Sequence, residues 1–293
     1  MNRTETAPRP RRSTEKSVLD RMSGLWRYRE LLVGLVRKEL KVKYKGSAVG
    51  FLWSMLNPAL YLVVFYFAFQ VVLRNRIPNF AIYLLSGLLV WNLFSTALAG
   101  ATRAVVGNAA IVKKVSFPRE VLPLASVGAA FVHFLLQSVV LLGALALFRY
   151  PPSPTFLLLV PVALVSLLLF TSALAVALSA VNVYARDTEH LIELVLLAWF
   201  WATPIVYQYR LVADQLGEAS WVYRLNPVTP VVLTFQRAIY NRIEPSGLAI
   251  LPAGKGVAWY LGQLGAVAAF SLVVLSLAFR LFGRLEGNFA EEL

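Results

Sequence analysis

Three carboxylates lie close together in the sequence, where a polar loop meets an apolar run: Asp187, Glu189 and Glu193. A membrane enzyme of glycan assembly needs such carboxylates at the membrane surface, to hold a metal ion or to act as a general base. Here they are spread along the boundary between loop and apolar run. An integral-membrane enzyme of glycan assembly therefore stays as an alternative, and we assign no catalytic residue and no metal site.

Other residue types indicate that the chain has no energy source of its own. The chain has no cysteine, which excludes disulfides, thiolate metal sites and cysteine nucleophiles. Lys255 lies between two glycines as in a phosphate-binding loop, but residue 249 is Ala and no Ser or Thr follows the lysine, so we expect no nucleotide site. His133 and Gln137 share one helix face, either as a proton relay or as polar contacts to a neighbouring helix. No carboxylate lies near the middle of an apolar run, which disfavours an ion-coupled carrier.

The composition predicts an all-α polytopic membrane protein. Apolar residues make up 58% of the 293 residues, charged residues make up 15%, and the mean hydropathy is +0.66. Six apolar runs are long enough to span a bilayer. They cover residues 49–73, 80–101, 121–148, 156–180, 191–208 and 257–282.

The basic residues predict the orientation in the membrane. Thirteen of the 28 Lys and Arg lie before residue 50, beside the first apolar run, so they indicate a cytoplasmic flank rather than a nucleic-acid site. Alternate segments carry 20 Lys and Arg on the side of the N terminus and 8 on the other side. Both termini are therefore expected in the cytoplasm, with the chain as a multi-pass protein of the cytoplasmic (inner) membrane.

Residues 25–48, after a polar and basic tail at 1–24, predict an amphipathic helix at the membrane interface. One face carries Tyr28, Leu31, Leu32, Leu35, Val36 and Val42, and the other carries Arg27, Arg37, Lys38, Lys41 and Lys45. Glu39 interrupts the apolar face, which predicts a buried partner for its carboxylate. From these residues alone, the helix either anchors the chain or gates a substrate.

Two connections have more structure than a plain loop. The cytoplasmic connection 102–120 is polar but has regularly placed apolar side chains, and it reads either as a short helix presented to a partner or as an ordinary surface loop. In the external loop 209–256, apolar residues keep helical spacing after Asn226-Pro227, which indicates an amphipathic or re-entrant helix against the outer leaflet. A short tail at 283–293 ends the chain.

Four motifs together resemble the transmembrane subunits of ABC type-2 polysaccharide exporters. They are RELLVGLVRKELKVKYKGSAVGFLWSMLNP at 29–58, NAAIVKKVSFPREVLP at 108–123, RDTEHLIELVLLAWFWATPIVY at 186–207, and Asn226-Pro227. The resemblance covers nearly all of the chain from about residue 25 onward. Such permeases carry O antigen, teichoic acid or galactan on lipid carriers.

The resemblance implies a homodimer that binds two copies of a separate ATPase subunit. That partner would bind ATP and Mg, so this chain is not expected to be an enzyme itself or to hold a cofactor. The amphipathic segment would form a gate helix beside which the substrate enters, with Tyr28, Arg37, Lys41, Tyr44 and Lys45 at the entrance. A coupling helix maps onto residues 104–116, and its implied ATPase contacts are Ile111, Val112, Val115, Phe117, Pro118, Arg119, Glu120, Arg186 and Asp187.

Aromatic residues of the first and fifth spans are the implied channel wall: Trp53, Tyr61, Phe65, Trp199, Trp201 and Tyr207. Sugar rings stack their C–H faces on aromatic rings, whereas a charged wall would trap a pyrophosphate. The resemblance, with which this chemistry agrees, implies a permease domain at 49–282 that exports a polyprenyl-pyrophosphate-linked polysaccharide. A drug or lipid exporter of the same architecture is the second alternative.

Overall fold

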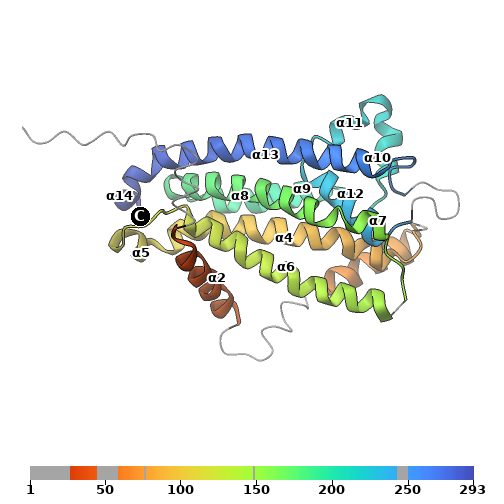
Figure 1. Cartoon of the computed structure of the whole chain (residues 1–293), viewed down its shortest axis with the longest axis horizontal. Helices are drawn as coiled ribbons and strands as arrows, with labels where there is room; N and C mark the ends of the chain where they lie inside the picture. Colours follow the sequence, from red (N-terminus) through yellow and green to blue (C-terminus); the bar gives the residue numbers. More distant parts are fainter. Residues whose placement is uncertain (1–26, 45–58, 76, 148, 243–249) are drawn as a thin grey trace, which may run out of the picture.

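The computed structural model describes residues 27–44, 59–75, 77–147, 149–242 and 250–293, and every regular element in these ranges is helical. The long axis follows four helices (Figure 1): α4 Phe80–Gly107, α6 Val121–Leu147, α8 Val160–Tyr184 and α13 Val257–Leu285. The single-turn helix α7 Pro154–Leu157 precedes α8. The predicted all-α class is thus confirmed for the described part of the chain.

Four stretches are long and apolar enough to cross a membrane: Phe80–Gly107, Val121–Leu147, Pro154–Tyr184 and Val257–Glu292. They match the predicted second, third, fourth and sixth spans. The first two begin where the sequence predicts, but α4 continues past the predicted end at 101 to Gly107. The count of six spans and the side of each terminus stay predictions.

The other two predicted spans are shorter helices within the described residues. The first is described from Ala59 and reaches Val72, ending in a π-helical turn, η1 Tyr66–Val72. The fifth is α9 Thr188–Trp201, whose 14 residues extend for about 21 Å, less than the roughly 30 Å of a bilayer core. Pro204 follows soon after, and because a proline disfavours the α region for the residue before it, the segment 202–208 leaves the helix.

The predicted external helix is present but is buried in the bundle. After α10 Tyr209–Leu216, η2 Gly217–Ala219 and α11 Ser220–Tyr223, the chain forms α12 Val228–Ile239. Every residue of α12 except Arg237 is buried, and the helix packs against α4, α7, α8 and α13. The alternative of a helix resting on the outer leaflet is therefore wrong, because α12 has no face left for lipid.

The opposite end of the bundle gathers the expected gate and coupling elements. There, α2 Arg29–Tyr44 crosses α6, and α5 Ala109–Lys114 lies beside α14 Phe289–Glu292 and the C terminus (Figure 1). The single turn η4 Glu286–Asn288 connects α13 to α14. One apolar cluster, distinct from the main core, joins α2, α5 and α14 to the ends of α6, α8 and α13. The predicted gate and coupling segments therefore share one small core.

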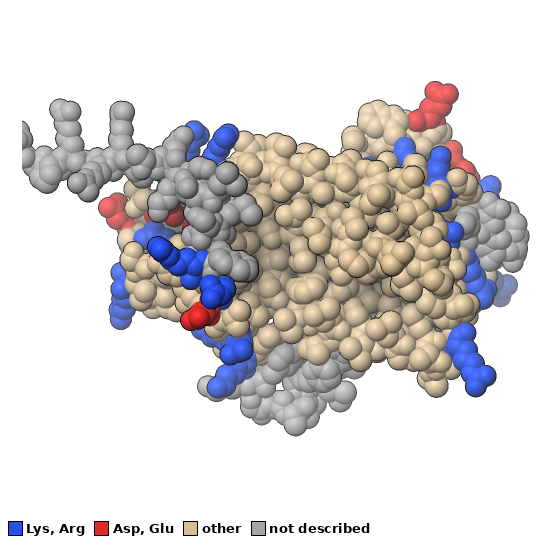
Figure 2. Space-filling view, in the orientation of Figure 1, with Lys and Arg blue, Asp and Glu red and all other residues tan. Residues whose placement is uncertain are grey.

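Charged side chains gather at the two ends of the long axis on the face that Figure 2 shows, and the surface between them is uncharged. Many large apolar side chains of the long helices are exposed, such as Leu142 on α6 and Val273 on α13, which are 62% and 60% exposed. An apolar belt between two charged ends is the surface expected of a protein that spans a bilayer.

Candidate functional site

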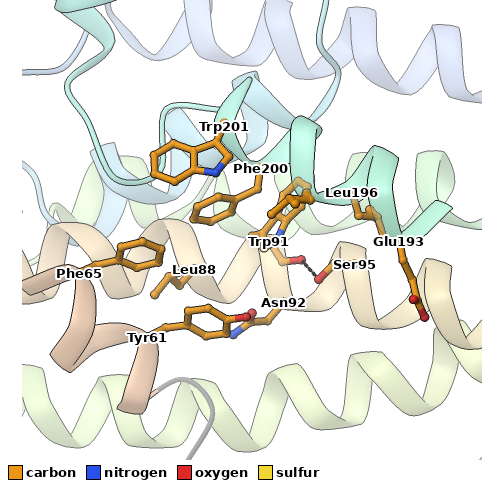
Figure 3. Close-up of a pocket in the computed structure, with 11 residues that line it drawn as sticks. Tyr61, Phe65, Leu88, Trp91, Asn92, Ser95, Glu193, Leu196, Phe200 and Trp201 are labelled. Atoms are coloured by element: carbon orange, nitrogen blue, oxygen red, sulfur yellow. Dashed lines mark hydrogen bonds between the residues drawn. The ribbon is translucent and has the colours of Figure 1, made fainter. Parts of the chain in front are cut away.

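A cavity of about 370 Å³ opens between the Ala59–Val72 helix, α4 and α9 (Figure 3). Tyr61 and Phe65 line it from the first helix, and Phe200 and Trp201 from α9. The rest of the lining consists of Leu88, Trp91, Asn92, Ser95, Glu193, Leu196 and Leu197. The cavity is thus an aromatic pocket with a few polar groups.

Ring contacts build the wall of this cavity. The Phe65 ring stacks on Phe200 at 5.6 Å between centroids and 18° between planes, and on Tyr61 at 5.9 Å and 14°. Trp201 meets Phe65 edge-on at 6.4 Å. Tyr61 and Trp201 are about half exposed, at 50% and 49%, so the wall is ordered by its own packing yet presents free ring faces.

Polar groups lie on α4 and at one end of the cavity. The Ser95 hydroxyl donates to the Trp91 carbonyl at 2.9 Å, a bond within α4, and the Asn92 amide lines the same side. Glu193 forms an ion pair with Arg103 at 3.5 Å, and both side chains are 53% exposed. The α4 extension past the predicted end carries Arg103, so the pair connects the cavity to the α4–α5 end of the bundle.

Three of the six expected wall aromatics therefore meet in one cavity, and the other three do not. Trp199 points to the other side of α9, where its ring contacts Phe94 at 5.1 Å and its Nε1 donates to Asn226 Oδ1 at 2.8 Å. The Tyr207 hydroxyl donates to the Trp201 carbonyl at 2.6 Å and also bonds to the Tyr223 hydroxyl. Trp53 lies outside the described residues. Helical spacing already separates Trp199 from Trp201, since two residues correspond to about 200°.

The gate-helix residues divide between two environments. Tyr28 is half-buried against the small core, and Leu35 on the same face is buried, while Arg37 and Lys41 are exposed. Val42, expected on the apolar face, is 67% exposed. Tyr44 ends α2, and Lys45 lies outside the described residues. The basic face of α2 is thus free to meet an anion.

Glu39 has the buried partner that the sequence predicts. Ser126 of α6 donates its hydroxyl to Glu39 Oε1 at 2.8 Å, and the two side chains line a small cavity together with Thr96 and His133. Burial raises the pKa of the Glu39 carboxyl above its ordinary value, although the Ser126 bond and nearby Lys38 favour the charged form. The prediction for Glu39 is confirmed, and its charge is less stable here than in water.

A second bond fixes α2 to the turn between α4 and α5. Lys38 Nζ donates to Asn108 Oδ1 at 2.8 Å, and Asn108 Nδ2 donates to the Ala104 carbonyl at 2.8 Å. Asn108 is the residue between α4 and α5. Sequence reasoning missed this contact, because it placed Lys38 only on a basic face, and no periodicity indicates a partner 70 residues away.

The expected coupling residues are partly inside the subunit. Val112 and Glu120 are only 2% and 4% exposed, whereas Val115 is 55% exposed and Ile111, Phe117, Pro118 and Arg119 are half-buried. Arg119 donates to the Glu286 carbonyl, and its guanidinium lies 5.7 Å from the Phe289 ring centre. Arg186 and Asp187 are exposed at the start of α9. A partner can therefore reach Val115, Arg186 and Asp187, while Val112 holds α5 in place.

No three His, Asp or Glu side chains within the described ranges are grouped closely enough to hold a metal ion. Of the three carboxylates considered for an enzyme, Glu193 is paired with Arg103 at the end of the aromatic cavity. The charge of that carboxylate is thus partly balanced by a cation rather than shared with another acid.

Comparison with known proteins matches residues 30–240 to the family model described as ABC-2 type transporter. The chain is 36% identical over 270 residues to the O-antigen export system permease protein RfbA of Myxococcus xanthus, covering 92% of this chain and 97% of that protein. Two proteins of the same name from Klebsiella pneumoniae are 31% and 32% identical, over 90% and 72% of this chain and 95% and 81% of theirs. The match covers nearly all of α2, all of α5 and α9, and the aromatic cavity, so this chain is a multi-pass membrane protein that belongs to the ABC-2 type transporter family.

Proposed function

We propose that this chain is the permease subunit of an ATP-driven exporter that moves a lipid-linked polysaccharide out of the cytoplasm. The substrate class is a glycan on a polyprenyl pyrophosphate, such as an O antigen, a teichoic acid or a galactan. The names of the similar proteins, which are O-antigen export permeases, support the class. The aromatic cavity is the observation that carries the proposal.

This cavity suits a sugar chain that has to slide. Tyr61 and Trp201 present half-exposed rings on which the C–H faces of a sugar ring can stack, and Asn92 and Ser95 provide exchangeable partners for hydroxyl groups. The one carboxylate, Glu193, is balanced by Arg103 at one end. Because the contacts along this wall are weak and similar to one another, a sugar unit can dissociate from one contact as readily as it forms the next.

The exposed surface beside the cavity supports a homodimer. On α9, Leu194 and Leu197 are 66% and 62% exposed, and on the neighbouring helix Val63 and Phe67 are 64% and 61% exposed. A second copy that covers this surface would close the open side of the cavity and form a channel between the subunits. The proposed assembly therefore has two copies of this chain and two ATPase subunits, which bind the ATP and Mg.

The basic face of α2 provides an entrance for the pyrophosphate. Arg37 and Lys41 are exposed on the side of α2 that does not pack on the bundle, and their charges would attract an anion at the cytoplasmic leaflet. The same charges would also bind anionic lipids, so α2 serves both as an anchor and as an entrance. The orientation predicted from Lys and Arg counts puts this end in the cytoplasm.

Energy would reach the channel through α5. Its exposed Val115 and the nearby α9 start at Arg186 and Asp187 form the surface offered to the ATPase. The Lys38 bond to Asn108 then transmits a movement of the α4–α5 corner to the gate helix. Since α2, α5 and α14 share one small core, they would move as a unit.

The test uses cells in which the native gene is replaced by variants. The exposed Trp201→Ala change should slow the appearance of glycan at the cell surface and cause lipid-linked glycan to accumulate inside. The matched control is Val195→Ala, which truncates a half-exposed side chain of the same helix that neither lines the cavity nor belongs to the proposed subunit contact. Equal export by the two variants would contradict the role of the cavity. If the substrate were a drug or lipid, small hydrophobic molecules would instead stimulate the ATPase while the glycan stayed unaffected.

A further inference from the structure

We propose that a groove between α11 and α13 binds one anionic phospholipid, with its phosphate at Arg224 and an acyl chain along α13. The groove lies at the end of the bundle that carries α10 and α11, opposite α5 and the C terminus (Figure 1). In the predicted orientation this is the outer leaflet. The inference is independent of the aromatic cavity and of the substrate proposed for it.

The groove is large and mainly apolar. Its volume is about 570 Å³, within the roughly 300–1,000 Å³ usual for a ligand site. Its lining comes from Trp221, Arg224, Leu225, Pro227, Gln263, Ala266, Val267 and Phe270. Trp221 is 54% exposed and Phe270 is 52% exposed, so two aromatic rings stand at its sides without cover from the rest of the subunit.

Two cations share one aromatic neighbour at this part of the groove: Arg224, which lines the groove, and Lys255, which lies outside its lining. The Arg224 guanidinium lies 5.4 Å from the centre of the Trp259 ring, and Lys255 Nζ lies 5.9 Å from the same centre. Within the described residues, neither cation takes part in an ion pair, whereas Arg210 on the neighbouring α10 is bonded to Asp214 at 2.8 Å. Two cations held over one ring, without an ion pair to a carboxylate of the described residues, favour a ligand with net negative charge.

The lower part of the groove suits a hydrocarbon chain. From Phe270 the exposed apolar face of α13 continues through Val273 and Leu277, which are 60% and 55% exposed, toward the uncharged middle zone of Figure 2. Gln263, between the rim and this face, makes no hydrogen bond to any described residue and can donate its amide to a lipid ester. Along the groove, the cation, the amide and the apolar face follow one another in the same order as the phosphate, the ester and the acyl chain of a phospholipid.

A phospholipid suits the groove better than a sugar or a second subunit. A neutral sugar would leave Arg224 and Lys255 without an anion, and a second copy of this chain would bring the same two cations toward each other in a symmetric contact. An anionic headgroup such as phosphatidylglycerol satisfies both cations. Bound in this way, the lipid would brace the short α11 against the long α13.

The test is native mass spectrometry of the full complex, extracted in mild detergent and titrated with phosphatidylglycerol, phosphatidylcholine or inorganic phosphate. We expect phosphatidylglycerol to bind most tightly. The Arg224→Gln variant should bind it about tenfold more weakly, the loss expected for one charge-assisted hydrogen bond. Ala266→Phe, which narrows the apolar part of the groove, should weaken the binding of both phosphatidylglycerol and phosphatidylcholine.

Arg210→Gln is the matched control, because it removes a cation from the same end of the bundle but outside the groove. Equal loss of phosphatidylglycerol in Arg210→Gln and Arg224→Gln would overturn the proposal, since it would show only a general charge effect. Binding of inorganic phosphate as tight as that of the lipid would also overturn it. Dissociation of the complex by Ala266→Phe, with lipid binding unchanged, would show that the groove is a subunit contact instead.

Discussion

Gly128 on α6 sets how closely α2 can approach the bundle. A Cβ added there would lie 2.9 Å from Val36 Cγ2 of α2, whereas carbon atoms in contact are normally about 3.5–4.0 Å apart. The Gly128→Ala change would therefore push α2 away by roughly 0.6–1.1 Å. Overpacking of this kind costs about 1–3 kcal/mol, which reduces the docked population relative to the undocked one by about 5- to 150-fold.

Gly143→Ala is the matched control for this prediction. Gly143 lies on the same helix, and an added Cβ there would meet no atom within 4 Å. Both changes replace a glycine by alanine within α6, so both gain about the same helix propensity, roughly 1 kcal/mol. Any difference between them reports the contact with Val36.

The assay uses the absence of cysteine in the chain. A Lys38→Cys and Asn108→Cys pair should be joined readily by a short bis-maleimide linker when α2 is docked, because the bond between Lys38 Nζ and Asn108 Oδ1 keeps these two positions within the combined reach of their side chains. We expect Gly128→Ala to slow this cross-linking, by at most the 5- to 150-fold change in the ratio of docked to undocked chains, and Gly143→Ala to leave it unchanged. Equal rates in both backgrounds would refute the reasoning that α6 limits the position of α2.

Three further predictions concern α2, α5 and α9. Because burial raises the pKa of Glu39, the protonated form favours docking, so docking should be strongest at acid pH and weaken as the pH rises through the raised pKa. The thiols' own ionisation changes the cross-linking rate with pH in every variant, so the rate is compared with that of the Glu39→Gln variant at each pH. The ratio of the two rates should fall as the pH rises, and a constant ratio would contradict the prediction. Val115→Asp should release the ATPase in a pull-down without lowering the melting temperature, whereas Val112→Asp buries a charge and should lower it; the opposite pattern would mean that α5 faces the partner differently. Trp199→Phe loses the bond to Asn226 and should reduce the free energy of unfolding by about 0.5–1.5 kcal/mol in denaturant titrations, and no loss would show that the bond is replaced.

Hydropathy was sufficient to predict the long helices, because a run of twenty or more apolar residues in lipid has to satisfy its backbone within one helix. It missed the end of α4, where Arg103 in the predicted loop continues the helix and pairs with Glu193. It also left open whether α12 is a surface helix, since helical spacing shows one apolar face and cannot show that Thr229 and Gln236 on the other face are buried as well.

The site was predictable to a similar extent. Tyr61, Phe65 and Trp201 were expected together and lie together, and the interruption of an apolar face by Glu39 predicted its buried partner. The Lys38 bond to Asn108 depends on the angle at which α2 crosses α6, which no local pattern encodes. The same holds for the burial of Val112, because an apolar residue in a polar loop can equally cover its own subunit or meet a partner.

The most direct test of the central claim is movement of glycan in inverted membrane vesicles that contain this chain and its ATPase. Lipid-linked glycan that is transported enters the vesicle lumen and becomes protected from periodate, which does not cross the membrane. We predict that ATP increases protection only when the chain is present, and that Val115→Asp abolishes the increase. Protection that rises equally with ATP in vesicles lacking the chain would contradict the account.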